Sequence, residues 1–204
     1  MYFRFLPDES SGATSYLLAD LDSGAAVLID PRSSDMPVLA AMLLEYRLHL
    51  QWLLRTHQHE GAQPEEEQAL AALGASMVAP GSASCDGELL GFGNEHLRII
   101  ATPGHTDGCL SFMWRDRLFC GDLLSVGACP HQPRPASPEA LWDSVTRKVF
   151  TLPNETLLFC NHARHARMVS SVLEQRCCHP WFAGASRDEF LSRIAHDTAE
   201  LPPR

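Results

Sequence analysis

Residues 102–124 read TPGHTDGCLSFMWRDRLFCGDLL, and this segment indicates how the chain is built. It contains two apolar runs, 109–114 and 117–120, separated by two charged residues, which is the pattern of two strands joined by a tight turn. His105 lies shortly before the first run, and Asp122 closely follows the second. We expect both side chains at a sheet edge, in loops that the strands position.

Two more apolar runs end in the same way. The run 51–56 leads into His57 through the segment RTHQH, and the run 97–101 leads into the TPGH segment. Three separate strands are therefore expected to end beside His57, His105 or Asp122. Two imidazoles and one carboxylate form the facial triad that suits non-haem Fe(II), and the same donors can hold Zn(II) with an activated water.

Short strand-like and helix-like runs alternate along the rest of the chain, and 204 residues fit a single domain, 1–204. The runs 14–20 and 25–30, separated by Leu-Asp-Ser-Gly, predict a hairpin. Further strands are expected at 76–79 and 156–160. Helices are expected at 35–48, 64–73, 137–150 and 165–176, and a C-terminal helix is expected to begin at a capping box formed by Ser186 and Glu189.

The composition is that of an ordinary globular domain, with 45% apolar and 20% charged residues. The formal net charge is -9, which argues against a nucleic-acid-binding protein because such proteins carry a basic patch for the phosphates. The sequence contains no recognisable secretory leader and no apolar run long enough to span a membrane. We therefore expect a cytoplasmic protein without membrane contact.

The motifs THxH (56–59), TPGHT (102–106) and GD (121–122), in this order, resemble those of the metallo-β-lactamase superfamily, above all the persulfide dioxygenases and next glyoxalase II. The resemblance extends over nearly the whole chain, from SSGATSYLLAD near the start to ALWDSVTRKVFTLPNETLLF and RDEFLSRI near the end. It implies an α/β fold of the αββα sandwich type, in which two mixed sheets pack face to face and helices flank them.

The resemblance also implies roles for individual residues. His57, His105 and Asp122 match the three ligands of the single iron in persulfide dioxygenases. His59 matches the second histidine of THxH, which ligates metal in the hydrolases and lies beside the metal in the dioxygenases. We therefore expect His59 to be catalytic and to hydrogen-bond the reacting oxygen. One Fe(II) per chain is the expected cofactor, with Zn(II) as the alternative.

The chain departs from the family pattern at the second metal. The family motif continues as H-x-H-x-D-H, but Gly61 and Ala62 stand where an Asp and a third His would bind that metal. Neither side chain offers a ligand atom. This difference predicts a mononuclear site, unless Glu60, one residue earlier, takes the place of the missing ligand.

Two further departures fall where the family contacts its substrate. After Asp122 the family has a GCGRTDF-like segment, but here Cys129 keeps its place while the Arg is displaced or lost. The family's HDY is His-Ala-Arg at 162–164, so glutathione persulfide is expected to be a poorer substrate. The loop 128–138 contains four prolines and is expected to shape the substrate pocket. The residues expected to contact substrate are Cys129, His131, Arg134 and His162.

Three functions fit these observations. The first is a mononuclear Fe(II) dioxygenase of a persulfide or related thiol, with altered specificity. The second is a mononuclear zinc hydrolase of a thioester or lactone, and the third is a non-catalytic member that binds a ligand. Retention of all three metal ligands on separate strands favours an enzyme. The expected partner is a small-molecule thiol, persulfide or thioester, and the resemblance leaves a homodimer open.

Overall fold

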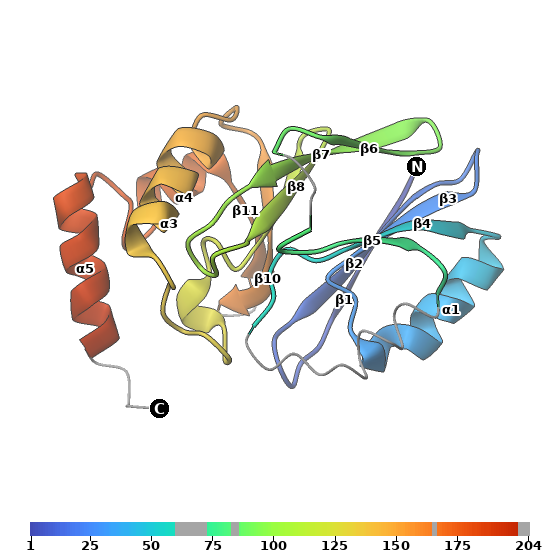
Figure 1. Cartoon of the computed structure of the whole chain (residues 1–204), viewed down its shortest axis with the longest axis horizontal. Coiled ribbons are helices and arrows are strands. Elements are labelled where there is room, and N and C mark those ends of the chain that lie inside the picture. Colours follow the sequence, from blue (N-terminus) through green and yellow to red (C-terminus); the bar gives the residue numbers. More distant parts are fainter. Residues whose placement is uncertain (60–72, 83–85, 165–166, 200–204) are drawn as a thin grey trace.

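The computed structural model describes residues 1–59, 73–82, 86–164 and 167–199. Two sheets face each other, and helices cover their outer faces (Figure 1). This is the αββα sandwich that the sequence motifs predict. The expected helix at 64–73 and the positions of Gly61 and Ala62 lie outside the described residues, apart from residue 73.

The first sheet has the strand order β1-β2-β3-β4-β5. The first three strands are antiparallel, and β4 and β5 continue the sheet in parallel. Both β2 and β3 are buried along their whole length, which is why their sequences are apolar on both faces rather than alternating. The strands are β1 (Tyr2–Pro7), β2 (Thr14–Asp20), β3 (Ala25–Ile29), β4 (His49–Leu54) and β5 (Ser76–Val78).

Helix α1 (Met36–Glu45) covers the outer face of this sheet and follows a 3-10 turn at Ser33–Asp35. Its fully buried Leu39 packs with Leu17 and Leu28 in one apolar cluster. Burying a leucine in this way contributes roughly 1.5–3 kcal/mol. The helix therefore closes one side of the sandwich.

The second sheet has the strand order β11-β10-β9-β8-β7-β6, in which only β9 and β10 run parallel. Its strands are β6 (Leu89–Phe92), β7 (Glu95–Ala101), β8 (Leu110–Trp114), β9 (Arg117–Gly121), β10 (Leu157–Arg164) and β11 (Arg167–Ser171). The other helical segments of the described residues are a 3-10 turn at Val126–Ala128, α3 (Pro138–Ser144) with a π-helical continuation at Val145–Val149, α4 (Val172–Cys178) and α5 (Arg187–Ala199). Helices α3, α4 and α5 lie at the opposite end of the molecule from α1 (Figure 1).

Aromatic side chains from both sheets form the core between them. Tyr16 of β2 packs edge-on against Phe119 of β9, with 5.1 Å between ring centroids, and Phe119 stacks on Phe159 of β10 at 5.2 Å. The hydroxyl of Tyr16 donates a hydrogen bond to the carbonyl of Cys160. The two sheets are thus joined directly beneath the strand ends that carry the candidate site.

Most of the expected elements are present, including the hairpin of β2 and β3 and the capping box, in which Ser186 and Glu189 bond each other. The expected helix at 165–176 is wrong in its first half. Residues Arg167–Ser171 instead form edge strand β11, because they pair with β10. Helix α4 begins only after Ser171, whose side chain accepts a hydrogen bond from the backbone N–H of Glu174. Sheet pairing therefore overrode the local helical pattern.

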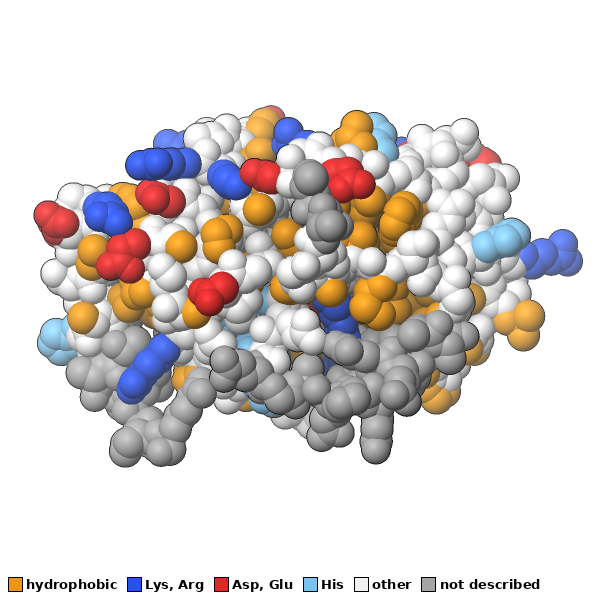
Figure 2. Space-filling model, in the orientation of Figure 1, with side chains coloured by type: hydrophobic (Ala, Val, Ile, Leu, Met, Phe, Trp, Pro, Cys, Tyr) orange, Lys and Arg blue, Asp and Glu red, His pale blue; other side chains and the backbone are white. Residues whose placement is uncertain are grey.

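The surface offers two further observations. No helix within the described residues is both long and apolar enough to cross a bilayer. On the face shown in Figure 2, acidic and basic side chains lie interspersed over the half of the molecule that carries α3, α4 and α5.

Candidate metal centre

The three motif segments meet at one edge of the sandwich. His57 follows β4, His105 lies in the loop after β7, and Asp122 follows β9. All three residues are buried, with 8%, 0% and 1% of their surface exposed. The rings of His57 and His105 are 5.0 Å apart, and His57 Nε2 lies 3.4 Å from Asp122 Oδ2. The three residues expected to bind a metal therefore lie close together, with His57 and His105 in different groups of possible ligands and Asp122 in both.

Glycines make this close approach possible. Gly121, directly before Asp122, has a φ of +54°, and a Cβ there would lie 2.4 Å from Thr56 Oγ1. Gly104, directly before His105, has a φ of +144°, and its Cβ would lie 2.4 Å from the backbone Cα of Leu141. A side chain at either position would push apart the segments that carry the metal-binding residues.

His57 is oriented by two residues that motif reasoning did not single out. The hydroxyl of Thr56 donates to Asp30 Oδ2 at 2.7 Å and lies 2.8 Å from His57 Nδ1. Because that hydroxyl has only one hydrogen, His57 Nδ1–H donates to it, and a neutral His57 ring then has its lone pair on Nε2. His57 Nε2 and Asp122 Oδ2 are then two acceptors that face each other, an arrangement that a shared cation would satisfy.

Asp122 is held by groups on two sides. Its Oδ2 lies 2.7 Å from His162 Nδ1, and its Oδ1 accepts hydrogen bonds from the backbone N–H of His162 at 3.0 Å and the hydroxyl of Ser125 at 3.2 Å. Burial opposes ionisation, but the His162 hydrogen bond and the nearby imidazoles outweigh it and hold the pKa of Asp122 well below its usual range. Asp122 is therefore a carboxylate at neutral pH.

His105 and His59 are neutral rings, and each can offer a nitrogen lone pair to a metal. Burial, with a contribution from His57, lowers the pKa of each to about 4. His105 Nε2 lies 3.2 Å from the Gln132 carbonyl, which can only accept, so Nε2 carries the hydrogen and Nδ1 the lone pair. The Nδ1 atoms of both rings are buried without a hydrogen-bond partner among the described residues. Unpartnered buried imidazole nitrogens beside a carboxylate fit a metal ion.

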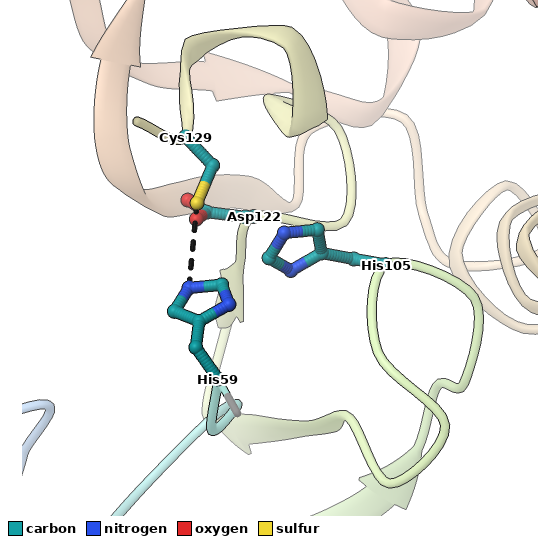
Figure 3. A group of neighbouring side chains, drawn as sticks. All are labelled: His59, His105, Asp122 and Cys129. Carbon is teal, nitrogen blue, oxygen red and sulfur yellow. Dashed lines mark hydrogen bonds between the residues drawn. The ribbon is translucent and has the colours of Figure 1, made fainter. Parts of the chain in front are cut away.

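The side chains divide into two overlapping sets of possible ligands. One set contains His59, His105, Asp122 and Cys129, and the other contains His57, Asp122 and His162, each with ligand atoms within 4.8 Å of one another. Figure 3 shows the first set converging from separate segments of the chain. Asp122 belongs to both sets and is the common centre of the site.

The proline-rich loop approaches this centre through Cys129 and His131. Cys129 is buried, with its Sγ 3.3 Å from His59 Nε2, and the ring of His131 lies 5.4 Å from that of His59. Burial, then the charge of Asp122, raises the pKa of the Cys129 thiol to about 12. Gln132, which sequence reasoning missed, bonds the backbone and the ring of His105. Arg134 lies on the exposed side of the loop.

Comparison with known proteins agrees with the geometry. The chain is 32% identical to mitochondrial persulfide dioxygenase ETHE1 of Bos taurus, over 98% of this chain and 82% of that protein. It also superposes on the crystal structure of ETHE1 from Myxococcus xanthus with a TM-score of 0.86 and 33% identity, over 99% of this chain and 92% of that one. The chain belongs to the persulfide dioxygenase and glyoxalase II group of the metallo-β-lactamase superfamily.

This chain is also similar to proteins named for a hydrolase activity. It is 31% identical to hydroxyacylglutathione hydrolase of Rhodospirillum rubrum, over 72% of this chain and 60% of that protein. A metallo-β-lactamase of Staphylococcus aureus shares the fold with a TM-score of 0.83 at 20% identity. No protein-family model matches the chain. The cytoplasmic location and the homodimer considered from the sequence remain predictions.

Proposed function

We propose that this protein is a mononuclear non-haem Fe(II) dioxygenase that acts on a persulfide or a related thiol, with a substrate preference that differs from that of its relatives. His57, His105 and Asp122 are the proposed ligands. The observation that carries the proposal is the pair formed by His57 Nε2 and Asp122 Oδ2, two acceptors 3.4 Å apart with the buried ring of His105 beside them. A divalent cation would bond to both acceptors.

The donor types agree with this choice of metal. Two imidazoles and a carboxylate match the facial triad, and Fe(II) bound there would supply oxygen-activating redox chemistry. Residues 61 and 62 are Gly and Ala, which have no side-chain donor for a second metal. One metal per chain follows from this composition.

The surrounding residues have separate tasks in the proposed reaction. Thr56 and Asp30 fix the tautomer of His57, and His162 and Ser125 fix the carboxylate of Asp122. The ring of His59 lies 4.9 Å from that of His57. From this position, His59 would donate a hydrogen bond to the reacting oxygen.

The loop after Asp122 is the proposed specificity element. Cys129 and His131 approach His59 from this loop and would face a sulfur-bearing substrate, and Arg134 would meet an anionic group at the exposed rim. His162 would contact substrate through the part of its ring that faces away from Asp122. The displaced Arg and the missing Tyr of HDY favour a substrate other than glutathione persulfide.

A mononuclear zinc hydrolase of a thioester or lactone is the second candidate. The observation in its favour is the position of His59, which lies in the same group of possible ligands as His105 and Asp122. A metal bound with His59 would suit Zn(II), whose chemistry is the activation of water for attack on a carbonyl. The relatives named hydroxyacylglutathione hydrolase make this a specific alternative.

The test is to purify the protein without an affinity tag, measure its metal content by elemental analysis, and assay three reactions. These are O₂ uptake with glutathione persulfide, O₂ uptake with smaller persulfides, and hydrolysis of glutathione thioesters. About one iron per chain with O₂ uptake on a persulfide supports the dioxygenase. Thioester hydrolysis by a zinc-loaded protein without O₂ uptake would replace it with the hydrolase.

Variants at the proposed ligands test whether these residues bind the metal. His105→Ala and Asp122→Ala should each abolish stoichiometric metal binding, and His57→Ala should weaken it strongly. His96→Ala is the matched control, because this histidine is exposed on β7. Two tightly bound metals per chain in the unmodified protein would contradict the mononuclear site.

A further inference from the structure

The side chain of Cys129 points toward the candidate metal centre (Figure 3). It is 1% exposed, and its Sγ lies 3.3 Å from His59 Nε2. Figure 3 shows this sulfur directly over the Asp122 carboxylate, with His59 and His105 approaching from two other directions. One ligand atom from each of these four residues lies within 4.8 Å of the other three.

A second observation points to a ligand at this place. His105 is fully buried, its Nε2–H is used by the carbonyl of Gln132, and its Nδ1 has no hydrogen-bond partner among the described residues. His59 is only half-buried, but its Nδ1 atom is also buried and has no hydrogen-bond partner among the described residues. A buried polar atom without a partner is costly unless something binds it. The unpartnered nitrogen of His105 belongs to a fully buried ring whose residue forms one group with a thiol, a carboxylate and a second imidazole, and this combination indicates a bound cation.

We propose that Cys129 is a fourth, displaceable ligand, whose thiolate closes the metal site together with His59, His105 and Asp122 when no substrate is bound. The inference rests on the mononuclear site of the proposed function. It adds a closed state to the open triad of His57, His105 and Asp122, and the two arrangements share His105 and Asp122. One sulfur, two imidazoles and one carboxylate would supply four ligands, the number found in closed metal sites.

The loop is built to hold the thiol in this position. Cys129 directly follows the 3-10 turn Val126–Ala128, and its N–H donates to the carbonyl of Val126 at 3.1 Å. Further along the loop, the side chain of Gln132 donates to the backbone carbonyl of His105, and so does the N–H of Ala136, at 3.0 Å. The segment that carries Cys129 is thus fixed to the segment that carries His105.

The chemistry of the exchange is a substitution of one sulfur for another. As metal binds, the Cys129 S–H bond breaks, its proton leaves to solvent, and the thiolate bonds to the metal. An entering thiol or persulfide binds as its anion and takes that position, and its proton goes to Cys129, which becomes a neutral thiol again. No oxidant or reductant is needed for this exchange. The closed state would keep oxygen from the metal until a sulfur substrate arrives.

The experiment uses cobalt(II) as a spectroscopic probe in the full chain. Thiolate bound to cobalt(II) gives an intense near-ultraviolet charge-transfer band, whereas imidazole and carboxylate do not. The unmodified protein should show this band at one cobalt per chain. Cys129→Ser and Cys129→Ala should lose it, and their cobalt affinity should fall at least about tenfold. Cys177→Ser, which removes an exposed thiol on α4, is the control and should keep the band.

A second measurement needs no variant and so does not depend on their folding. X-ray absorption of the zinc-loaded, unmodified protein should contain one sulfur neighbour at about 2.3 Å. When a small thiol that lacks an absorbing group is added to the unmodified protein, the metal should still have one sulfur neighbour, because the thiol replaces Cys129. The same thiol should restore the cobalt band in Cys129→Ala, because it occupies the vacated position. A coordination shell of nitrogen and oxygen alone, or a cobalt band that persists in Cys129→Ala without added thiol, overturns the proposal.

The result is distinguishable from a failure of the proposed function. A thiolate band in a protein that takes up no O₂ with any persulfide leaves the Cys129 ligand intact and removes the dioxygenase. O₂ uptake on a persulfide, with no sulfur neighbour of the metal in the resting protein, supports the dioxygenase and removes Cys129 as a ligand.

Discussion

His162 Nδ1 lies 2.7 Å from Asp122 Oδ2, and the backbone N–H of His162 donates to Asp122 Oδ1 at 3.0 Å. The two residues are forty positions apart in the chain, and both are buried. His162 therefore clamps both oxygens of the carboxylate that is common to the two ligand sets. This contact gives His162 a positioning role in addition to the substrate contact expected from the sequence.

The first prediction follows from this clamp. His162→Ala should keep a stoichiometry of one metal per chain but weaken the affinity by about 10- to 100-fold, because the carboxylate loses its ring partner. The free energy of unfolding of the metal-free protein should also fall by about 1.5–3 kcal/mol, the size of a hydrogen bond to a charged group. Metal titration and urea unfolding are the measurements. His96→Ala, on the surface, should change neither quantity.

The second prediction concerns the pH dependence of stability in the metal-free protein. The pKa of His59 and of His105 is lowered to about 4 in the fold, against about 6.5 in an unfolded chain. Between these values the unfolded state binds more protons, so the free energy of unfolding falls as the pH drops from about 6.5 to 4. A pKa lowered from about 6.5 to about 4 corresponds to roughly 3 kcal/mol for the buried His105 and to less for the half-buried His59, where solvent screens the charges, so the total loss should be on the order of several kcal/mol.

Urea unfolding at a series of pH values checks this prediction. A double variant with Ala at 59 and 105 should flatten the profile between pH 6.5 and 4. The effect of Asp122 falls in a separate window, because its lowered pKa gives stability that is lost only as the pH drops below the usual carboxyl range. A profile that is equally steep in the double variant would show that other groups cause the loss.

The third prediction is that Gly121→Ala is harmful while Gly127→Ala is not. A Cβ at Gly121 would lie 2.4 Å from Thr56 Oγ1, at a φ of +54°, whereas a Cβ at Gly127 would meet nothing within 4 Å. Strain of this kind costs about 1–3 kcal/mol and would displace Thr56 from His57. Thermal unfolding and metal titration should both register the first change and neither the second. Equal behaviour of the two variants would contradict the tight packing behind the site.

The fourth prediction assigns the proline-rich loop to specificity. Replacing His131 and Arg134 together with Ala should leave metal content unchanged and raise KM for the persulfide substrate by about tenfold or more, the cost of a charge-assisted hydrogen bond. Elemental analysis and steady-state O₂ uptake are the measurements. If KM and kcat both stay at the unmodified values, the loop is a connector to α3 and does not bind substrate.

Sequence alone was enough to predict the segments that meet at the site. A strand that ends in His or Asp is recognised from a few neighbouring residues. The apolar runs before His57 and Asp122 therefore predict both strands and the positions of these side chains. Helix caps also depend on residues close together in the sequence. The helices expected to begin at Ser137 and Ser186 do begin there, and both side chains accept capping hydrogen bonds. The missing second-metal donors at 61 and 62 are likewise a matter of residue identity.

Other features depend on contacts between distant parts of the chain. The pairing of β11 with β10 replaced half of an expected helix, because sheet hydrogen bonds outweigh a weak local preference. The Asp30–Thr56 bond joins residues 26 apart, the Gln132–His105 bond 27 and the Cys129–His59 contact 70. No spacing rule links such residues. Sequence therefore determined which side chains could bind a metal, whereas tertiary packing decided which tautomers they adopt and which thiol faces them.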